Sequence, residues 1–321
     1  MGDHSLAVWL GFTGVVVALL VLDLAVLNRR SHVLSMKEAL RWSGSLVCLA
    51  MIFGGFLLLK EGSAKALEFY TGYIIELSLS VDNLFVFILV FQYFGVPAEL
   101  QPRVLKWGIL GAIVMRLIMI MAGAVLLARF DWIIWVFGGI LIVTGIRMFL
   151  VEEQRVEPER NPVVKLARKV LPFTHTYDGP HFFVRSIRGT VMATPLLLVL
   201  LVIEWTDLVF AIDSIPAVFA ITRDPFIVYS SNIFAILGLR ALFFVLADMM
   251  DRFEYLKPGI ATILVFVGLK MALSPWVHLP ILLSLGVIIF VLVTAAVLSI
   301  RKLRREERAA KERGQGLGVG G

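Results

Sequence analysis

Two apolar stretches of the sequence each contain a pair of carboxylates six residues apart. Glu76 and Asp82 form the first pair, and Asp207 and Asp213 form the second, with Glu204 just before it. A charged side chain at the centre of a bilayer costs at least about 2.5 to 3.5 kcal/mol, so acids in membrane-spanning helices face the bundle interior and usually serve a function. Because five clustered acids repel one another, some must be protonated or bind cations. These spacings predict cation chemistry inside a membrane.

The predicted ligands for that cation are oxygen atoms. Each second carboxylate is followed by an amide or a hydroxyl residue, and Ser78, Ser80 and Thr206 add hydroxyls, whereas no histidine lies within the two stretches. Oxygen ligands suit Mn²⁺, Mg²⁺ or Ca²⁺ better than Zn²⁺ or Cu⁺, which prefer nitrogen or sulfur. The predicted metal ligands are Glu76, Asp82, Asn83, Glu204, Asp207, Asp213 and Ser214.

The composition places these residues in a membrane. Of the 321 residues, 59% are hydrophobic, and the mean hydropathy is +0.90, which is more apolar surface than a soluble core can bury. Many windows reach the roughly 20 apolar residues that cross a hydrocarbon core of about 30 Å. The one cysteine, Cys48, excludes a disulfide within the chain and a cysteine-cluster metal site, and we expect it to pack in a helix.

The predicted fold is an all-α polytopic membrane protein with nine transmembrane helices, which puts the two termini on opposite sides. We interpret the first span as a helix and not as a cleaved signal peptide, because basic residues follow it instead of preceding it. Asp23, near the end of that span, would either belong to an exit path or cap the helix. The predicted spans are Leu6–Leu27, Leu40–Leu59, Leu67–Phe94, Val104–Ala128, Trp132–Leu150, Thr190–Ile221, Phe226–Ala247, Gly259–Leu273 and Leu279–Ile300.

Lysine and arginine predict the orientation. With the amino terminus outside and the carboxy terminus in the cytoplasm, 22 basic residues fall in inner loops and the tail, and only Lys60, Lys65, Arg129 and Arg223 fall outside. The positive-inside rule favours this orientation. Topology and anionic lipid headgroups thereby explain the net charge of +6, and no nucleic-acid partner is expected.

An internal repeat organises the spans. Gly145-Ile-Arg147-Met148 in the fifth span matches Gly268-Leu-Lys270-Met271 in the eighth, and the two acidic stretches occupy the third and sixth spans. Spans three to five, about residues 67–150, therefore repeat as spans six to eight, about residues 190–273. Because each unit crosses the membrane three times, its copy enters from the opposite face. Such an inverted repeat places substrate near the bilayer midplane.

The predicted domain organisation is a single transmembrane domain, residues 1–300. Its loop at 151–189 is polar, basic and rich in proline, which indicates a cytoplasmic linker. We interpret His175, Asp178 and His181 there as solvated residues in preference to a weak metal site. Residues 301–321 form a basic cytoplasmic tail, helical at first and glycine-rich at its end.

One regular helix cannot direct all the acids of the second stretch to one ion. Glu204 and Asp207 share a face, but Asp213 lies about 120° from Asp207 at about 100° per residue. We expect Pro216 to break this helix, and Asp82-Asn83 to break the other, so that the acid pairs converge. Two separate sites used in sequence are the alternative.

A purely structural salt-bridge network is the simpler interpretation of the acids. The basic residues within spans are too few to neutralise all of them. These basic residues are Arg116, Arg147, Arg240 and Lys270.

The sequence resembles the TerC family, and its Alx-type members most of all. In the second half the resemblance rests on Glu204–Asp207, Phe210-Ala-Ile-Asp-Ser-Ile-Pro-Ala217 and Ser231-Asn-Ile-Phe-Ala-Ile-Leu-Gly-Leu-Arg240. In the first half it rests on Gly72-Tyr-Ile-Ile-Glu76 and Ser80-Val-Asp-Asn83, and it covers nearly the whole chain except the tail. The resemblance implies a nine-helix inner-membrane protein related to LysE-type exporters and associated with Mn²⁺ efflux, with the acids named above as metal ligands.

The function predicted is export of a divalent cation, with Mn²⁺ favoured and protons as the candidate counter-ion. A Ca²⁺ or other cation/proton exchanger is one alternative, and a non-transporting membrane partner for metal loading or assembly of secreted proteins is another. Neither enzymatic activity nor a resident cofactor is expected, since the sequence has no evident pair of nucleophile and base. An acidic core would repel tellurite, an oxyanion, which argues against its direct transport.

Overall fold

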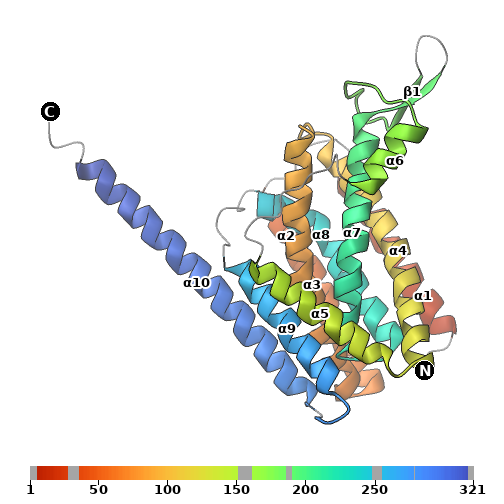
Figure 1. Ribbon diagram of the computed structural model, residues 1–321, viewed down its shortest axis with the longest axis vertical. Coiled ribbons are helices and arrows are strands. Elements are labelled where there is room, and N and C mark those ends of the chain that lie inside the picture. The colour runs from red at the N-terminus through yellow and green to blue at the C-terminus, as the bar shows by residue number, and fades with distance from the viewer. Residues whose placement is uncertain are drawn as a thin grey trace.

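The computed structural model describes residues 6–27, 36–150, 161–185, 190–247, 255–277 and 279–316. Within these ranges, the side chains of residues 6, 22–27, 82, 85, 240, 246, 247, 256 and 306–316 lie outside the description. Helices dominate the described chain, and one small hairpin interrupts them (Figure 1). In chain order the elements are α1 (Leu6–Leu27), α2 (Met36–Glu61), α3 (Ser63–Tyr93), α4 (Gln101–Arg129), α5 (Ile133–Leu150), α6 (Pro162–Val170), β1 (Phe183–Arg185), β2 (Val191–Ala193), α7 (Pro195–Phe219), α8 (Pro225–Ala247), α9 (Leu256–Leu273) and α10 (Ile281–Gly316).

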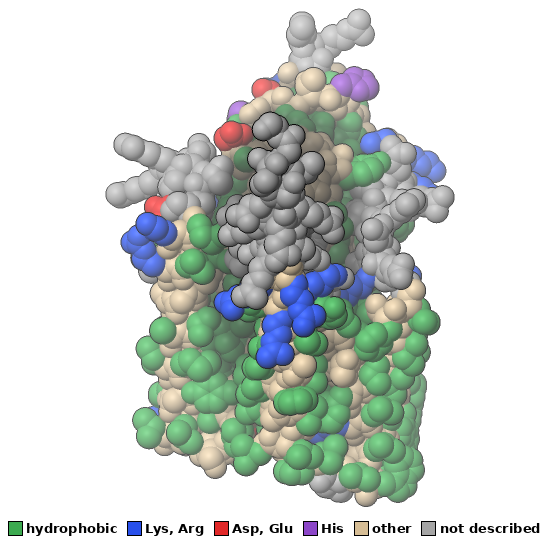
Figure 2. Space-filling model, turned by 90° about the vertical axis from the view of Figure 1, so that its left-hand side faces the viewer, with side chains coloured by type: hydrophobic (Ala, Val, Ile, Leu, Met, Phe, Trp, Pro, Cys, Tyr) green, Lys and Arg blue, Asp and Glu red, His purple; other side chains and the backbone are tan. Residues whose placement is uncertain are grey.

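Six of the described helices are long and apolar enough to cross a membrane, namely α2, α3, α4, α5, α7 and the first part of α10, Ile281–Arg305. Shorter apolar segments occupy Ala7–Val21 of α1 and Pro225–Leu239 of α8. Figure 2 shows hydrophobic side chains over most of the lower part of one face, with Lys and Arg side chains along the upper border of this apolar surface. The prediction of a helical multi-pass membrane protein is confirmed.

α3 lies at the centre of the bundle. It packs against α2, α7 and α8, and 69% of its most apolar window is buried inside the protein, against 17% for α2. A helix surrounded by other helices instead of lipid can contain polar side chains, because the neighbouring helices supply hydrogen-bond partners for them. α3 is therefore the helix best placed to hold buried acids.

α5 and α9 pack closely together and run obliquely to α2, α4 and α7 (Figure 1). Glycines allow this approach: a Cβ atom added at Gly268 would lie 2.8 Å from the carbonyl oxygen of Gly138, and one added at Gly145 would lie 2.8 Å from that of Ala261. Small residues let helix backbones meet in this way within membranes. The matched glycines of the predicted repeat thus lie in one helix–helix interface.

The sixth predicted span begins later than expected. Residues Val191–Ala193 form strand β2, which pairs antiparallel with β1, and helix α7 starts only at Pro195. Proline suits the first helical turn, where its missing N–H would have no intrahelical partner. The predicted start at Thr190 is therefore wrong, since apolar residues before Pro195 belong to the hairpin.

The linker between the two halves folds onto the end of the bundle. The Tyr177 hydroxyl donates to the carbonyl oxygen of Phe94, 2.7 Å away, in the turn between α3 and α4. The Arg103 guanidinium lies 5.6 Å from the ring centroid of Phe182. Burial raises the pKa of Tyr177 above its usual value, so this phenol stays protonated and keeps donating.

The predicted helix breaks are absent from both acidic stretches. Helix α3 runs without interruption through Asp82-Asn83, and α7 runs through Pro216 to Phe219. A proline removes one backbone hydrogen bond, and Pro216 lies only three residues from the end of α7, where the buried residues around it pack on both sides. The acids are therefore positioned by regular helices.

A buried cluster of carboxylates and arginine

Arg116 of α4 is fully buried and binds carboxylates from two other helices. Its Nη1 atom donates to Oε1 of Glu76 on α3. On α7, Asp207 accepts through both oxygens, with Nη2 to Oδ1 at 3.1 Å and Nε to Oδ2 at 3.3 Å. Nη1 also donates to Ser214 Oγ at 3.2 Å. We call these four residues the Arg116 cluster; it joins α3, α4 and α7 by charge-assisted hydrogen bonds, the stronger class of such bonds.

Helical spacing explains why these residues meet. Asp207 and Ser214 are seven residues apart, two turns of helix, so both face α4 from the same side of α7. Small residues bring α4 close: a Cβ atom added at Gly108 would lie 3.3 Å from Ile203 of α7. Gly111, one turn further along α4, leaves the space that the Glu204 carboxylate fills.

The other acids of the second stretch have different neighbours. Glu204 is half-buried and lies over Gly111. Asp213 accepts a hydrogen bond from Thr144 Oγ1 of α5, 2.8 Å away, on another side of α7. The regular helix thus keeps the angular separation that its spacing implies, and Asp213 does not join the Arg116 cluster.

Several candidate residues fall outside the cluster or outside the described side chains. Asn83 is buried on α3, whereas the side chains of Asp82, Asp23 and Arg240 are not among those described. The hydroxyls of Ser78 and Thr206 donate to carbonyl oxygens of their own helices, Ile74 at 2.6 Å and Val202 at 2.7 Å. These two hydroxyls are already satisfied by the backbone.

The described side chains hold no group of three or more His, Cys, Asp or Glu residues close enough to ligate a metal together. His175, Asp178 and His181 are exposed on the linker, where His181 Nδ1 lies 3.0 Å from the Asp178 carbonyl oxygen. Cys48 is exposed on the outer surface of the bundle, on α2. It lies in a helix as expected, but its side chain is exposed and does not pack inside the protein.

Sequence reasoning noted Arg116 but gave it no role in the site. The signal was available: two carboxylates buried in a membrane need a counter-charge, and few basic residues lie within the predicted spans. What the sequence did not reveal is which of the four basic residues would meet them.

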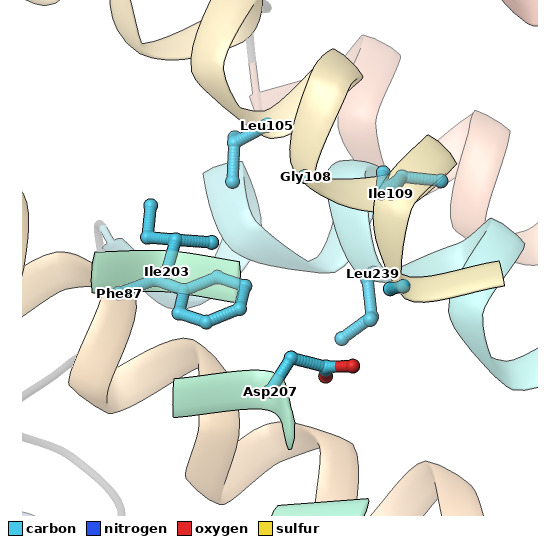
Figure 3. A pocket seen from close by; sticks show the side chains of 8 residues that line it. Phe87, Leu105, Gly108, Ile109, Ile203, Asp207 and Leu239 are labelled. Carbon is cyan, nitrogen blue, oxygen red and sulfur yellow. The ribbon is translucent and has the colours of Figure 1, made fainter. Parts of the chain in front are cut away.

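Asp207 is one of the residues that line a small apolar cavity. Figure 3 shows Asp207 as the only acidic side chain among the labelled lining residues, with its carboxylate close to the side chain of Leu239. Because Leu105 lies in the first turns of α4, the cavity is on the hairpin side of the Arg116 cluster. The lining residues are Phe87, Leu105, Gly108, Ile109, Ala112, Ile203, Asp207 and Leu239.

A second ion-pair network lies at the opposite end of the bundle. Lys65 Nζ at the start of α3 is 2.9 Å from Glu68 Oε2 and 3.1 Å from Oδ2 of Asp224, just before α8. Thr222 Oγ1 donates to the same Glu68 oxygen at 2.6 Å. We call these four residues the Lys65 network; it ties the start of α3 to the turn between α7 and α8.

Comparison with known proteins identifies the family. The sequence profile of the integral membrane protein TerC family matches residues 61–308. The chain is 51% identical over 300 residues to "Uncharacterized membrane protein STKORF319" of Myxococcus xanthus, covering 94% of each chain. It is 48% identical over 300 residues to "Putative membrane-bound redox modulator Alx" of Escherichia coli (strain K12), covering 91% of this chain and 93% of the relative. No solved structure is similar. The chain belongs to the TerC family of integral membrane proteins.

Proposed function

We propose that this protein transports divalent cations, with Mn²⁺ favoured, by exchanging the Arg116 guanidinium for a metal ion at Glu76 and Asp207. The proposal rests on the excess of acidic over basic groups in the buried cluster. Two carboxylates face one guanidinium, and all three side chains are at most 3% exposed. One positive charge cannot neutralise two negative charges, so a proton or a further cation must balance the remainder.

The chemistry of the cluster favours hard cations. Carboxylate oxygens of Glu76 and Asp207 and the hydroxyl of Ser214 already converge on one point, where Arg116 now sits. An arriving metal ion would compete with the guanidinium for the same oxygens, so Arg116 would act as a tethered counter-ion in the metal-free state. Oxygen ligands favour Mn²⁺, Mg²⁺ or Ca²⁺ over softer metals.

Protons provide a coupling ion. A carboxylate that releases its metal at the end of a transport cycle can take a proton instead, and either partner lowers the cost of a buried negative charge. Glu204, half-buried one turn before Asp207, offers a further carboxylate on the same side of α7. Metal would move out while protons move in, with no resident cofactor and no enzymatic step.

The proposal includes nine membrane spans with an inverted repeat, α3–α5 against α7–α9. Helix pairings support the repeat: α3 packs on α8 as α7 packs on α4, and α5 packs on α9. The matched motifs pair residue 145 with 268, and residue 138 with 261. If the repeat is symmetric, the distance from an added Cβ atom at Gly145 to the Ala261 carbonyl oxygen should equal that from an added Cβ atom at Gly268 to the Gly138 carbonyl oxygen. Both distances are 2.8 Å. A pseudo-two-fold axis through the α5–α9 interface accounts for this equality.

In the proposed orientation, the protein lies in the inner membrane with the hairpin and the tail on the cytoplasmic side. The linker and the tail are the two most basic segments outside the spans, and both β1 and the end of α10 lie toward the upper end of the molecule in Figure 1. Residues 301–316 continue α10 as a helix. The positive-inside rule places such segments inside.

The experiment is Mn²⁺ uptake into proteoliposomes that contain purified protein and a metal-quenched dye, under an imposed proton gradient. We expect Glu76→Gln and Asp207→Asn to lower the initial rate at least tenfold, because each removes a charged ligand. Glu99→Gln, an exposed acid on the turn between α3 and α4, is the matched control and should retain the wild-type rate.

Competing functions give different outcomes. If Ca²⁺ enters and Mn²⁺ neither enters nor competes, the protein is a Ca²⁺ exchanger and the metal assignment is wrong. If wild-type protein moves neither ion, transport is refuted and a role as a membrane partner in metal loading or assembly takes precedence. A redox role through a disulfide within this sequence is excluded, because it has one cysteine.

A further inference from the structure

Helix α8 carries a buried asparagine, Asn232, whose side chain forms no hydrogen bond with the residues that the structure describes. Ser230 and Ser231 beside it donate to carbonyl oxygens of Ile227 at 3.2 Å and Val228 at 3.1 Å. Asn232 is equally buried, at 0% exposure, but in the described part of the chain neither its Oδ1 nor its Nδ2 forms a hydrogen bond. A buried amide with two donors and two acceptor lone pairs needs partners, so Asn232 is placed for something other than packing.

Two further unpartnered atoms lie on the neighbouring helix α3. Glu76 uses Oε1 for Arg116. Among the described residues its Oε2 has no hydrogen-bond partner, and Ser80 Oγ, one turn later on the same face, has none either. Apart from Ser43 Oγ on α2, every buried side-chain N or O atom left without a hydrogen bond in the described residues belongs to Glu76, Ser80 or Asn232. The unsatisfied polar atoms are thus concentrated on α3 and α8.

The register of α3 and α8 places Asn232 within about one helical turn of Glu76, with Ser80 one turn beyond Glu76. The two helices run parallel and side by side: Lys65 meets Asp224 near their starts, and the rings of Phe91 and Phe243 are 5.4 Å apart near their ends. Between these contacts, a Cβ atom at Gly72 would lie 3.0 Å from Ser231 Oγ. Asn232 therefore lies beside the turn of α3 that leads to Glu76.

The direction of Asn232 follows from Leu239, seven residues further along α8 and so on the same face. Leu239 lines the cavity beside Asp207, as does Ile109 of α4 (Figure 3). Helix α4 runs antiparallel to α8, so two turns from Leu239 back to Asn232 correspond to two turns from Ile109 forward to Arg116. Asn232 faces the bundle interior at the depth of Arg116.

We propose that Asn232 and the oxygen of Glu76 that does not bind Arg116 form a subsite beside the Arg116 cluster that binds a divalent cation still carrying part of its water shell, with the Ser80 hydroxyl, one turn further along α3, as a partner for the retained water. This inference rests on the proposed function and adds a binding step to it. One charged and one neutral oxygen form a weak, hard ligand set, and the Asn232 amide N–H groups and the Ser80 hydroxyl can hold the retained water. The ion would bind here while Arg116 still occupies Asp207.

The test measures Mn²⁺ binding to purified protein by isothermal titration and the melting temperature with and without Mn²⁺. Asn232→Leu preserves size and removes both polar atoms. We expect its dissociation constant for Mn²⁺ to rise at least tenfold, with a correspondingly smaller Mn²⁺-induced rise in melting temperature, since that rise depends on ligand concentration relative to the dissociation constant. Without metal, the melting temperature of Asn232→Leu should equal or exceed that of the wild type, because the substitution removes an unpaired amide from an apolar environment.

Ser231→Ala is the matched control, since the neighbouring hydroxyl is already bonded to its own helix, and it should bind Mn²⁺ as the wild type does. A dissociation constant for Asn232→Leu within threefold of wild type would overturn the subsite. If Asn232→Leu does not fold, Asn232→Asp decides: the added charge should tighten Mn²⁺ binding at least threefold, and unchanged binding would overturn the inference. Wild-type protein that binds no Mn²⁺ refutes the proposed function itself, which is a separate result.

Discussion

Two ion-pair networks in this bundle have similar distances and opposite surroundings. In the Arg116 cluster, the Arg116–Asp207 pair spans 3.1 Å with side chains 0% and 3% exposed. In the Lys65 network, the Lys65–Asp224 pair also spans 3.1 Å, but the lysine is 32% exposed. An exposed ion pair contributes about 0.2 to 1 kcal/mol, whereas removing one partner of a buried pair costs about 3 to 5 kcal/mol. Burial, and not geometry, separates the two.

The difference indicates different tasks. Lys65 is partly exposed and can exchange its partners for water at little cost, although Asp224 beside it is 4% exposed. The Arg116 cluster is buried, so each of its carboxylates requires a cation or a proton as a partner. A site that always needs a cation is suited to swapping one cation for another.

The largest effect should come from Arg116→Met, which leaves Glu76 and Asp207 buried without a counter-charge. We expect a loss of about 3 to 5 kcal/mol in the free energy of unfolding. Thermal unfolding in detergent, followed by size-exclusion fluorescence, measures it. Arg129→Gln, an exposed arginine at the end of the same helix, should unfold as the wild type does. Equal melting temperatures for the two variants would refute the distinction between the networks.

Arg116→Lys should have the next largest effect. Lysine keeps the charge but cannot make the two-pronged contact that Nε and Nη2 make with Asp207. We expect a loss of about 1 to 3 kcal/mol in stability, together with tighter apparent binding of Mn²⁺, because a weaker tethered cation competes less well. Titration of the purified variant with Mn²⁺ measures the second effect; weaker binding than in wild type would contradict competition.

Asp213 offers an intermediate case, since it is half-buried and bonded to a neutral hydroxyl. Thr144→Val keeps the shape of the threonine and removes its 2.8 Å hydrogen bond to Asp213. We expect about 1 to 2 kcal/mol of destabilisation by thermal unfolding. Thr262→Val, at an exposed hydroxyl bonded only to its own helix, is the control and should cost less than 1 kcal/mol. A larger loss of stability for Thr262→Val than for Thr144→Val would show that the charge of the hydrogen-bond partner does not determine the size of the effect.

The smallest effect should come from Lys65→Gln. We expect the free energy of unfolding to fall by less than about 1 kcal/mol, and the difference from wild type to shrink further at high salt, because exposed pairs are screened. Melting temperatures at low and high salt measure this. A salt-independent loss as large as that of Arg116→Met would mean that the Lys65 network is as dry as the buried cluster.

Much of this arrangement follows from sequence. Apolar length predicts the helices, and the acids within them predict a polar interior, which Glu76 and Asp207 occupy as expected. The rotation of Asp213 away from Asp207 also follows from helical periodicity, and the structure bears it out through Thr144. Local rules succeed where a single helix decides the outcome.

The remainder depends on contacts between helices. The expected break at Pro216 is wrong because packing on both sides outweighs one lost hydrogen bond. The choice of Arg116 over the other basic residues depends on how closely Gly108 and Gly111 let α4 approach α7. The metal assignment for the seven candidate ligands stays a prediction, and Asp82 is one whose side chain is not described.

Helix α10 links the surrounding lipid to the acids of the bundle through its contacts with other helices. Its apolar part, Ile281–Arg305, has 25 residues, about 37 Å at about 1.5 Å per residue, which exceeds a hydrocarbon core of about 30 Å unless the helix tilts. α10 lies obliquely in Figure 1 and packs on α9, which packs on α5, the helix that holds Asp213 through Thr144. A change in bilayer thickness would alter the tilt of α10. We therefore expect the acyl-chain length of the surrounding lipids to influence the position of the acids in the bundle through the tilt of α10.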